Sequence, residues 1–234
     1  MTGSPRQEDL ANRLAAVRDR IAAACRAAGR KPEDVTLVAV TKTFPASDVR
    51  LLSGLGVTDF GENRDAEAAP KARECADLDL VWHFIGQLQT NKAVSVARYA
   101  TFVHSVDRLR LVRALGTGAR AAGRVLQCLI EVSLDGDPAR GGVPAGQVRG
   151  LAEALTAEEG LVLAGVMAIA PLGMPPADAF ARLGDSAAVV RTVRPAATVI
   201  SAGMSGDLEA AIGAGATHVR IGTALLGDRG ARVR

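Results

Sequence analysis

The amino-acid sequence predicts a (β/α)8 barrel. Short runs of strand-forming residues alternate with alanine-rich helical segments along the 234-residue chain, and this unit recurs about every 25–30 residues. Strands that alternate with helices pair in parallel through right-handed crossovers. An open doubly wound sheet is the alternative, and the absence of a G-x-G-x-x-G turn after the first expected strand argues against it.

The expected strands are rich in β-branched and other apolar residues. They are Thr36–Thr41, Val57–Phe60, Leu80–Ile85, Thr101–Ser105, Val125–Ser133, Leu161–Ala168, Ala197–Ser201 and His218–Ile221. Apolar residues at helical spacing occupy most of the intervening sequence. The expected helices are Ala46–Gly54, Asn63–Ala76, Asn91–Tyr99, Arg108–Ala122, Ala145–Ala157, Ala177–Thr192 and Ser205–Ala214.

An additional amphipathic helix is expected before the first strand. Apolar residues recur at helical spacing from Leu14 through Ile21, with arginines between them, and Gly29 ends the pattern. We expect this helix over residues 9–28 and a flexible polar segment over residues 1–8. Because no low-complexity linker interrupts the chain, all 234 residues are predicted to form a single domain.

Composition excludes several classes of function. The net charge is +3, acidic and basic residues are interspersed, and no basic stripe is joined to aromatic residues, so nucleic-acid binding is unsupported. Cys25, Cys75 and Cys128 are far apart and fit neither a metal site nor a disulfide framework. No apolar run resembles a signal peptide or reaches membrane-spanning length. We therefore expect a cytoplasmic protein that acts away from membranes.

A lysine follows the first expected strand directly. Lys42 comes after the apolar run Leu37–Val40, at the carboxyl end of a strand, where barrels collect their functional residues. Burying its ammonium is costly without a partner or a lowered pKa. Lys42 is therefore either a solvated lysine just beyond a strand end or an amine that forms a Schiff base with an aldehyde.

The loops after the last two expected strands suggest a phosphate site. Barrels often bind phosphate at these two loops. Ser205 is a candidate N-cap, with free amides behind it that could meet an anion, and Gly222 and Thr223 offer further amides and a hydroxyl. An ordinary helix cap and a turn glycine are the alternative. An amine beside a phosphate site indicates a phosphorylated aldehyde, and pyridoxal 5'-phosphate fits best among common cofactors.

Arg220 acquires a role in this interpretation. An arginine that faces the pyridine nitrogen keeps its own proton and so leaves that nitrogen unprotonated. The ring is then a weaker electron sink than one held by an aspartate. A salt bridge at the rim of the barrel is the alternative for Arg220.

Several stretches resemble the pyridoxal phosphate homeostasis protein family, in the family's order and across almost the whole chain. They are Ala39–Thr43, Phe60–Arg64, Trp82–Lys92, His104–Asp107, Gly203–Asp207 and Val219–Thr223. The resemblance implies the alanine racemase amino-terminal barrel without its second domain. It implies a cofactor bound covalently to Lys42, phosphate contacts around Ser205, and an arginine at the ring nitrogen. The implied cofactor-binding residues are Lys42, Asn63, Met204, Ser205, Arg220, Gly222 and Thr223.

Two segments depart from the family pattern. Glu131–Ser133 stands where the family usually has glutamine, valine and asparagine, and Arg140–Gly142 replaces a turn that usually contains lysine. Any role of these positions in gating the cofactor or contacting a partner is therefore open.

The resemblance implies a protein that buffers or delivers pyridoxal phosphate in vitamin B6 homeostasis, with no robust catalysis and no metal. Apo-enzymes that use this cofactor are the expected partners, and we expect a monomer. One rival is a single-domain amino-acid racemase, which needs a base on each face of the substrate carbanion. Lys42 could serve one face. The only tyrosine, Tyr99, is expected outside the barrel, while His83 and His104 are either candidate bases or hydrogen-bonded barrel histidines. A Schiff-base aldolase without cofactor is the other rival.

Overall fold

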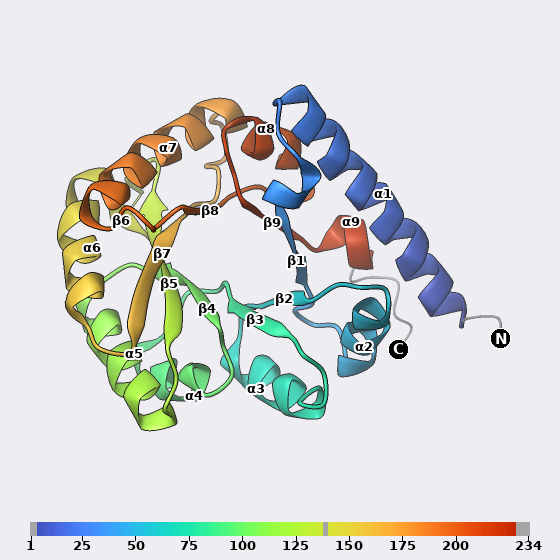
Figure 1. Cartoon of the computed structure of the whole chain (residues 1–234), viewed down its shortest axis with the longest axis horizontal. Coiled ribbons are helices and arrows are strands. Elements are labelled where there is room, and N and C mark those ends of the chain that lie inside the picture. Colours follow the sequence, from blue (N-terminus) through green and yellow to red (C-terminus); the bar gives the residue numbers. More distant parts are fainter. Residues whose placement is uncertain (1–3, 138–139, 228–234) are drawn as a thin grey trace.

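A closed barrel of parallel strands forms the centre of the molecule (Figure 1). The computed structural model describes residues 4–137 and 140–227. The barrel strands are β1 (Thr36–Val40), β2 (Asp59–Glu62), β3 (Val81–Phe84), β4 (Phe102–Val106), β5 (Leu126–Ser133), β7 (Leu161–Met167), β8 (Val199–Ser201) and β9 (His218–Ile221). They run in the order β4-β3-β2-β1-β9-β8-β7-β5, and pairing of β4 with β5 closes the barrel. The predicted eight-stranded barrel is confirmed. A two-residue strand, β6 (Val143–Pro144), pairs with the end of β5.

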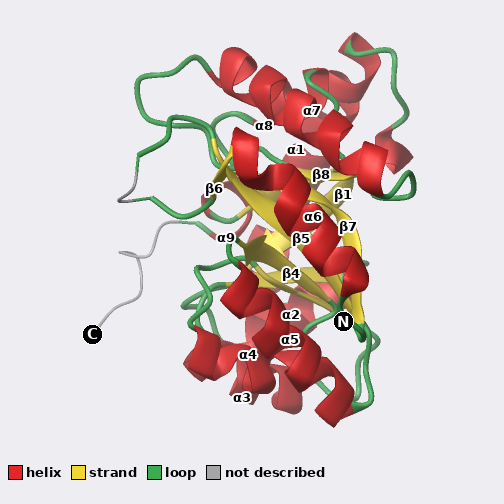
Figure 2. Cartoon of the chain, turned by 90° about the vertical axis from the view of Figure 1, so that its left-hand side faces the viewer, coloured by secondary structure: helices red, strands yellow, loops and turns green. Residues whose placement is uncertain are grey.

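Helices surround the strands on the outside (Figures 1 and 2). They are α1 (Pro5–Ala27), α2 (Ala46–Gly54), α3 (Asp65–Glu74), α4 (Ala93–Ala97), α5 (Leu109–Ala122), α6 (Val148–Ala157), α7 (Pro176–Val193), α8 (Leu208–Gly213) and α9 (Thr223–Leu226). Short 3-10 helices cover Pro32–Asp34, Thr90–Lys92 and Ala145–Gln147. No helix in the described ranges is long and apolar enough to cross a lipid bilayer.

The main core lies between the barrel and its helices. Successive residues of a strand face opposite sides, and many of the outward residues are apolar and meet the buried faces of helices. Val103 of β4, for example, belongs to one cluster with Leu111 and Leu115 of α5. Residues of α1 such as Leu14 join a second cluster with Ile221 of β9. Burial of these faces outside the barrel leaves its interior free for polar side chains.

The amino-terminal helix begins earlier than the sequence pattern indicates. α1 starts at Pro5 and therefore includes part of the segment expected to be flexible. The hydroxyl of Ser4 accepts a hydrogen bond from the Gln7 amide (3.3 Å), and Pro5 suits the first helical turn because its missing N–H would have no partner there. The other residues of that segment, 1–3, lie outside the described part of the chain.

The barrel interior is only partly apolar. Leu129, Ala164 and Met167 form a small buried cluster there, packed against Phe102 and Val199. Polar side chains occupy the rest of the interior, and the buried ones are His83, His104, Ser201 and Arg220. Buried polar groups are costly without partners. We therefore expect these four side chains to be hydrogen-bonded to one another or to the backbone.

Candidate functional site

A cavity of about 580 Å³ opens at the carboxyl ends of the strands. The structure brings all the residues predicted to bind the cofactor to its wall: Lys42, Asn63, Met204, Ser205, Arg220, Gly222 and Thr223. Sequence reasoning did not assign a role to several others that line it: Val40, Ile85, Gly86, Gln87, Glu131, Gly141, Ile169 and Gly206. Another cavity, of about 460 Å³, lies beside α3 and α4 outside the barrel and is lined by none of the predicted residues.

Lys42 is aimed at the cavity by contacts of its neighbour in the chain. Thr41 is fully buried, and its hydroxyl donates a hydrogen bond to Glu62 Oε1 (2.7 Å). Lys71 Nζ pairs with the same carboxylate and donates to the Thr41 carbonyl (2.9 Å). Because these contacts hold Thr41 on the outer face of the barrel, Lys42 is directed to the inner face, where it lines the cavity.

The chain turns sharply after Lys42. Thr43 has a φ of 69° and is the only residue other than glycine with a positive φ in the described ranges. Threonine rarely adopts this conformation, which stores strain and is found disproportionately at functional sites. The Thr43 amide donates to Glu67 Oε2 (3.0 Å), so α3 holds the strained turn in place. The chain therefore turns directly after Lys42, two residues beyond the end of β1.

Arg220 is buried, with 4% of its surface exposed. Its Nη1 donates to Ser201 Oγ (2.6 Å) and its Nη2 to the Ala168 carbonyl (2.9 Å). Burial lowers the pKa of Arg220 to about 10, so the guanidinium stays charged at neutral pH. The rim salt bridge considered above is not present, because no ion pair of Arg220 occurs among the described residues.

The expected N-cap role of Ser205 is wrong. α8 begins at Leu208 with Asp207 at its N-cap, and the Met204 amide donates to Asp207 Oδ1 (2.6 Å) in the turn before the helix. Ser205 instead ties the two candidate phosphate loops together: its Oγ accepts a hydrogen bond from the Ala224 amide (3.2 Å). That bond uses a lone pair and leaves the hydroxyl hydrogen available to a ligand.

The additional helix α1 supports the loop that carries Ser205. Arg20 Nη2 donates to the Ser205 carbonyl (3.0 Å), while its Nε donates to Glu209 Oε1 (2.8 Å). The carboxylate of Glu209 is thereby paired with an arginine of α1. The sequence pattern placed Arg20 on a helix at one end of the domain but gave no sign of this contact, because 185 residues separate it from Ser205.

Glu131 is an acidic residue in the wall of the cavity that received no role from the sequence. Burial raises its pKa to about 7, and nearby Asp107 acts in the same direction, against the charges of Arg220 and Arg140. Its Oε2 is buried without a hydrogen-bond partner. The inward register of β5, two residues beyond the interior Leu129, is the signal that could have identified it.

The two candidate second bases do not line the cavity. His83 and His104 lie deeper in the barrel and are hydrogen-bonded to one another (2.9 Å). Burial lowers the pKa of both imidazoles. Tyr99 lies outside the barrel, as expected, and donates to Asp65 Oδ1 (3.3 Å). The cavity wall therefore offers Lys42 and Glu131 as its titratable acid–base groups, with Arg220 as a fixed cation.

Comparison with known proteins places this barrel in a class. Residues 13–230 match the family model of the alanine racemase N-terminal domain. The pyridoxal phosphate homeostasis protein of Mycobacterium bovis is 44% identical, with 96% of this chain and 94% of the relative covered. The protein of that name in Escherichia coli is 39% identical over 94% of this chain and 97% of its own length. The chain belongs to the pyridoxal phosphate homeostasis protein family.

A solved structure agrees with this assignment. PipY of Synechococcus elongatus, determined with PLP bound, superposes with a TM-score of 0.81 at 35% identity. The superposition covers 93% of this chain and 100% of that one. The barrel seen here therefore matches that solved chain over its whole length.

Proposed function

We propose that this protein binds pyridoxal 5'-phosphate in the cavity at the carboxyl ends of the strands, attaches it covalently to Lys42, and buffers or delivers it to apo-enzymes in the cytoplasm. The observation that carries the proposal is the convergence of three kinds of group on one cavity: the amine of Lys42, the guanidinium of Arg220 and the loops that carry Ser205 and Thr223. Relatives named for pyridoxal phosphate homeostasis support it.

The residues fit the chemistry of this cofactor. Lys42 supplies an amine that can form a Schiff base with the aldehyde, and Arg220, with its pKa of about 10, can face the ring nitrogen without giving up its proton. The Ser205 hydroxyl and the amides near Gly222 can donate to the phosphate, with Met204 beside them. Gly86 packs so closely on Asn63 that a Cβ atom would lie 2.2 Å from the Asn63 carbonyl oxygen, so only glycine fits beside Asn63 at this point of the wall.

We further propose that the bound cofactor undergoes no robust turnover of amino acids. The cofactor supplies an electron sink when bound, but a cationic Arg220 beside the ring nitrogen weakens it. His83 and His104, the candidate second bases, are buried below the cavity and paired with one another. A missing general base typically costs about 10²–10⁴ in rate. The arrangement suits reversible binding better than committed chemistry.

Borohydride reduction followed by peptide mapping tests the attachment. The pyridoxyl group should be found on Lys42, and Lys42→Ala should lose the visible absorbance of the bound cofactor while keeping weak binding through the phosphate loops. Lys92→Ala is a matched control, because Lys92 is exposed and does not line the cavity. Recovery of the label chiefly on Lys92 or Lys71 would contradict the proposal.

Ligand comparison and amino-acid exchange separate the proposal from its rivals. Pyridoxal without its phosphate should bind far more weakly than pyridoxal phosphate, since a charge-assisted hydrogen bond contributes roughly 1.5–3 kcal/mol. An aldolase without cofactor would show no visible absorbance at all. A racemase would exchange the α-hydrogen of alanine, serine or glutamate with solvent faster than free pyridoxal phosphate does, and would lose this activity in Lys42→Ala.

A further inference from the structure

A continuous chain of hydrogen bonds crosses the barrel interior from its amino end to the cavity. Asp59, the first residue of β2, contacts His83 Nε2 through Oδ1 (2.9 Å). His83 Nδ1 contacts His104 Nε2 (2.9 Å), and His104 Nδ1 contacts Ser201 Oγ (3.0 Å). Ser201 Oγ in turn accepts from Arg220 Nη1 (2.6 Å). The chain therefore joins a carboxylate at one end of the barrel to the arginine at the other.

The direction of every bond follows from the charge of Asp59. Burial raises the pKa of Asp59, but hydrogen bonds from His83 and Thr58 outweigh it, so the group is an ionised acceptor at neutral pH. His83 must then donate from Nε2. Because burial lowers the pKa of His83 and keeps it neutral, its Nδ1 can only accept. His104 therefore donates from Nε2.

The hydrogen bonds beyond His104, toward the cavity, have the same direction. Burial, reinforced by the charges around it, lowers the pKa of His104 well below its usual value, so this imidazole is neutral as well. With its proton on Nε2, its Nδ1 must accept the hydrogen of the Ser201 hydroxyl. The lone pairs of Ser201 Oγ are then free to accept from Arg220. All donors in the chain point from the cation toward the anion, an order in which each bond polarises the next.

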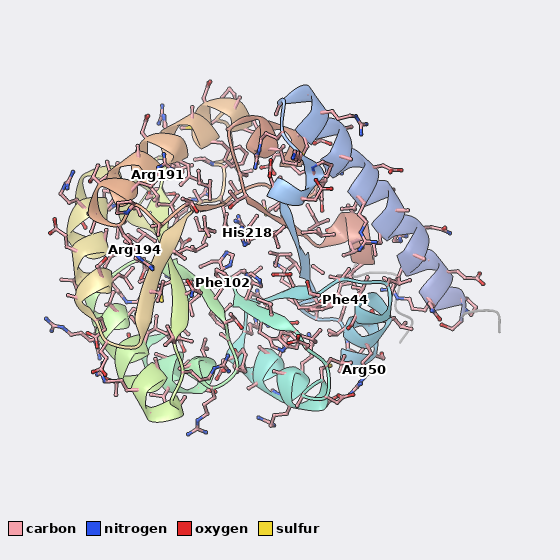
Figure 3. All side chains as sticks on the ribbon, viewed as in Figure 1. Phe44, Arg50, Phe102, Arg191, Arg194 and His218 are labelled. Carbon is pink, nitrogen blue, oxygen red and sulfur yellow. The ribbon has the colours of Figure 1, made fainter. Side chains whose placement is uncertain are left out.

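Neighbouring rings pack against the His83 imidazole in this orientation. The ring of His83 stacks on Phe102, with centroids 4.7 Å apart and planes at 5°. Phe102 and His218 both point into the barrel interior (Figure 3), with centroids 5.8 Å apart. His218 adds no charge, since burial lowers its pKa to about 4, and its Nδ1 bonds to Thr217 Oγ1 (2.9 Å). A ring flip of His83 would have to displace this packing.

We propose that Asp59 is a positioning residue for Arg220: its charge sets one direction for the chain through His83, His104 and Ser201, and so holds the Ser201 hydroxyl as an acceptor for the guanidinium. Asp59 lies at the start of β2, does not line the cavity and would never touch a ligand there. Arg220, which has no ion pair among the described residues, is thereby linked to a carboxylate on the far side of the barrel. The consequence for cofactor binding rests on the function proposed above.

The first test is nitrogen NMR of the cofactor-free protein labelled with 15N-histidine. The chain contains 3 histidines, so the spectrum is simple. At pH 7 both His83 and His104 should be neutral with the proton on Nε2. A proton on Nδ1 of either ring, or a charged imidazolium, would overturn the proposal. Since no ligand is involved, this result is independent of whether the protein binds pyridoxal phosphate.

The second test uses Asp59→Asn with Thr58→Val as its matched control. An amide can donate or accept, so Asp59→Asn should leave His83 and His104 as mixtures of two tautomers. Thr58 donates to the other oxygen of the same carboxylate (2.7 Å), and its loss should leave the tautomers unchanged. Unchanged tautomers in Asp59→Asn would show that its charge does not set the direction.

Binding of pyridoxal phosphate provides the functional readout. Ser201→Ala removes the contact to Arg220 and should weaken binding about tenfold, the effect of losing one hydrogen bond to a charged group. Asp59→Asn should weaken binding in the same direction and shift the visible absorbance of the bound cofactor, while Thr58→Val should do neither. Wild-type affinity and absorbance in Asp59→Asn would overturn the positioning role, whereas absence of binding in the wild type would refute only the proposed function.

Discussion

Single residues decide the electrostatics of the cavity. Lys42 supplies the amine and Arg220 the permanent cation, while Glu131 adds a carboxyl whose pKa is raised to about 7, mainly by burial. With Oε2 unpartnered, the ionised form of Glu131 lacks a compensating hydrogen bond. The cavity therefore changes its charge near neutral pH at Glu131.

Replacing Glu131 by glutamine should change how stability depends on pH. Between pH 4.5 and about 7 the folded protein binds the Glu131 proton and the unfolded chain does not, so this group makes the free energy of unfolding fall as pH rises. Glu131→Gln should therefore gain stability over the wild type at pH 8 relative to pH 5, by about 2 kcal/mol. Urea unfolding at both pH values measures this, and an equal difference at both would contradict it.

A buried ion pair connects one helix to two strands next to the cavity. Lys71 of α3 reaches across to Glu62 of β2 and to the carbonyl of Thr41, at the end of β1. Both side chains are almost fully buried. Burial raises the pKa of Glu62, and the charge of Lys71 acts against that shift. The pair thus joins one helix and two strands directly beneath the segment that presents Lys42.

Replacing one member of this ion pair should lower the free energy of unfolding more than replacing both members together. Lys71→Met leaves the Glu62 carboxyl buried without its cation, and the free energy of unfolding should fall by about 3 kcal/mol or more. The double variant Glu62→Gln with Lys71→Met has no charge to desolvate and should recover most of the loss. A double-mutant cycle by urea unfolding gives the coupling. Additive losses in the two single variants would show that the pair is not coupled.

The histidines of the folded protein are uncharged at neutral pH. His83, His104 and His218 all have lowered pKa values because the barrel interior buries them. As the pH falls below about 6.5 the unfolded chain therefore binds more protons at these sites than the folded protein does. Glu62 and Glu131, with raised pKa values, act in the opposite direction over part of this range.

We expect acid to destabilise the protein on balance, because three histidines outweigh two carboxyls. The free energy of unfolding should fall as the pH is lowered from 6.5 to 5, on the order of 1 kcal/mol per pH unit. Urea unfolding at pH 7, 6 and 5 measures the slope. Stability that is constant or rises toward pH 5 would contradict this and would mean that the histidines do not outweigh the carboxyls.

The sequence by itself determined the barrel and the residues that line its mouth. Strand and helix patterns are local, and in a parallel barrel all strand ends meet at one face, so reading the strand ends in order located Lys42, Arg220 and the loop residues Ser205 and Thr223. Their convergence on one cavity follows from topology alone. Their roles toward a cofactor remain predictions for the labelling and binding experiments above.

Only the tertiary structure decided what those residues touch. The sequence pattern placed Ser205 at a helix N-cap, but α8 begins only at Leu208, with Asp207 at its N-cap, and the Ser205 hydroxyl accepts a hydrogen bond from Ala224 of α9. The hydrogen bonds that link Asp59 to Arg220 could not be predicted from the sequence either, because the residues involved come from separate strands. His104 and Ser201, for instance, are 97 residues apart. Hydrogen-bond direction, burial and pKa depend on which residues are neighbours in space. These neighbours come from distant parts of the sequence and meet only when the barrel closes.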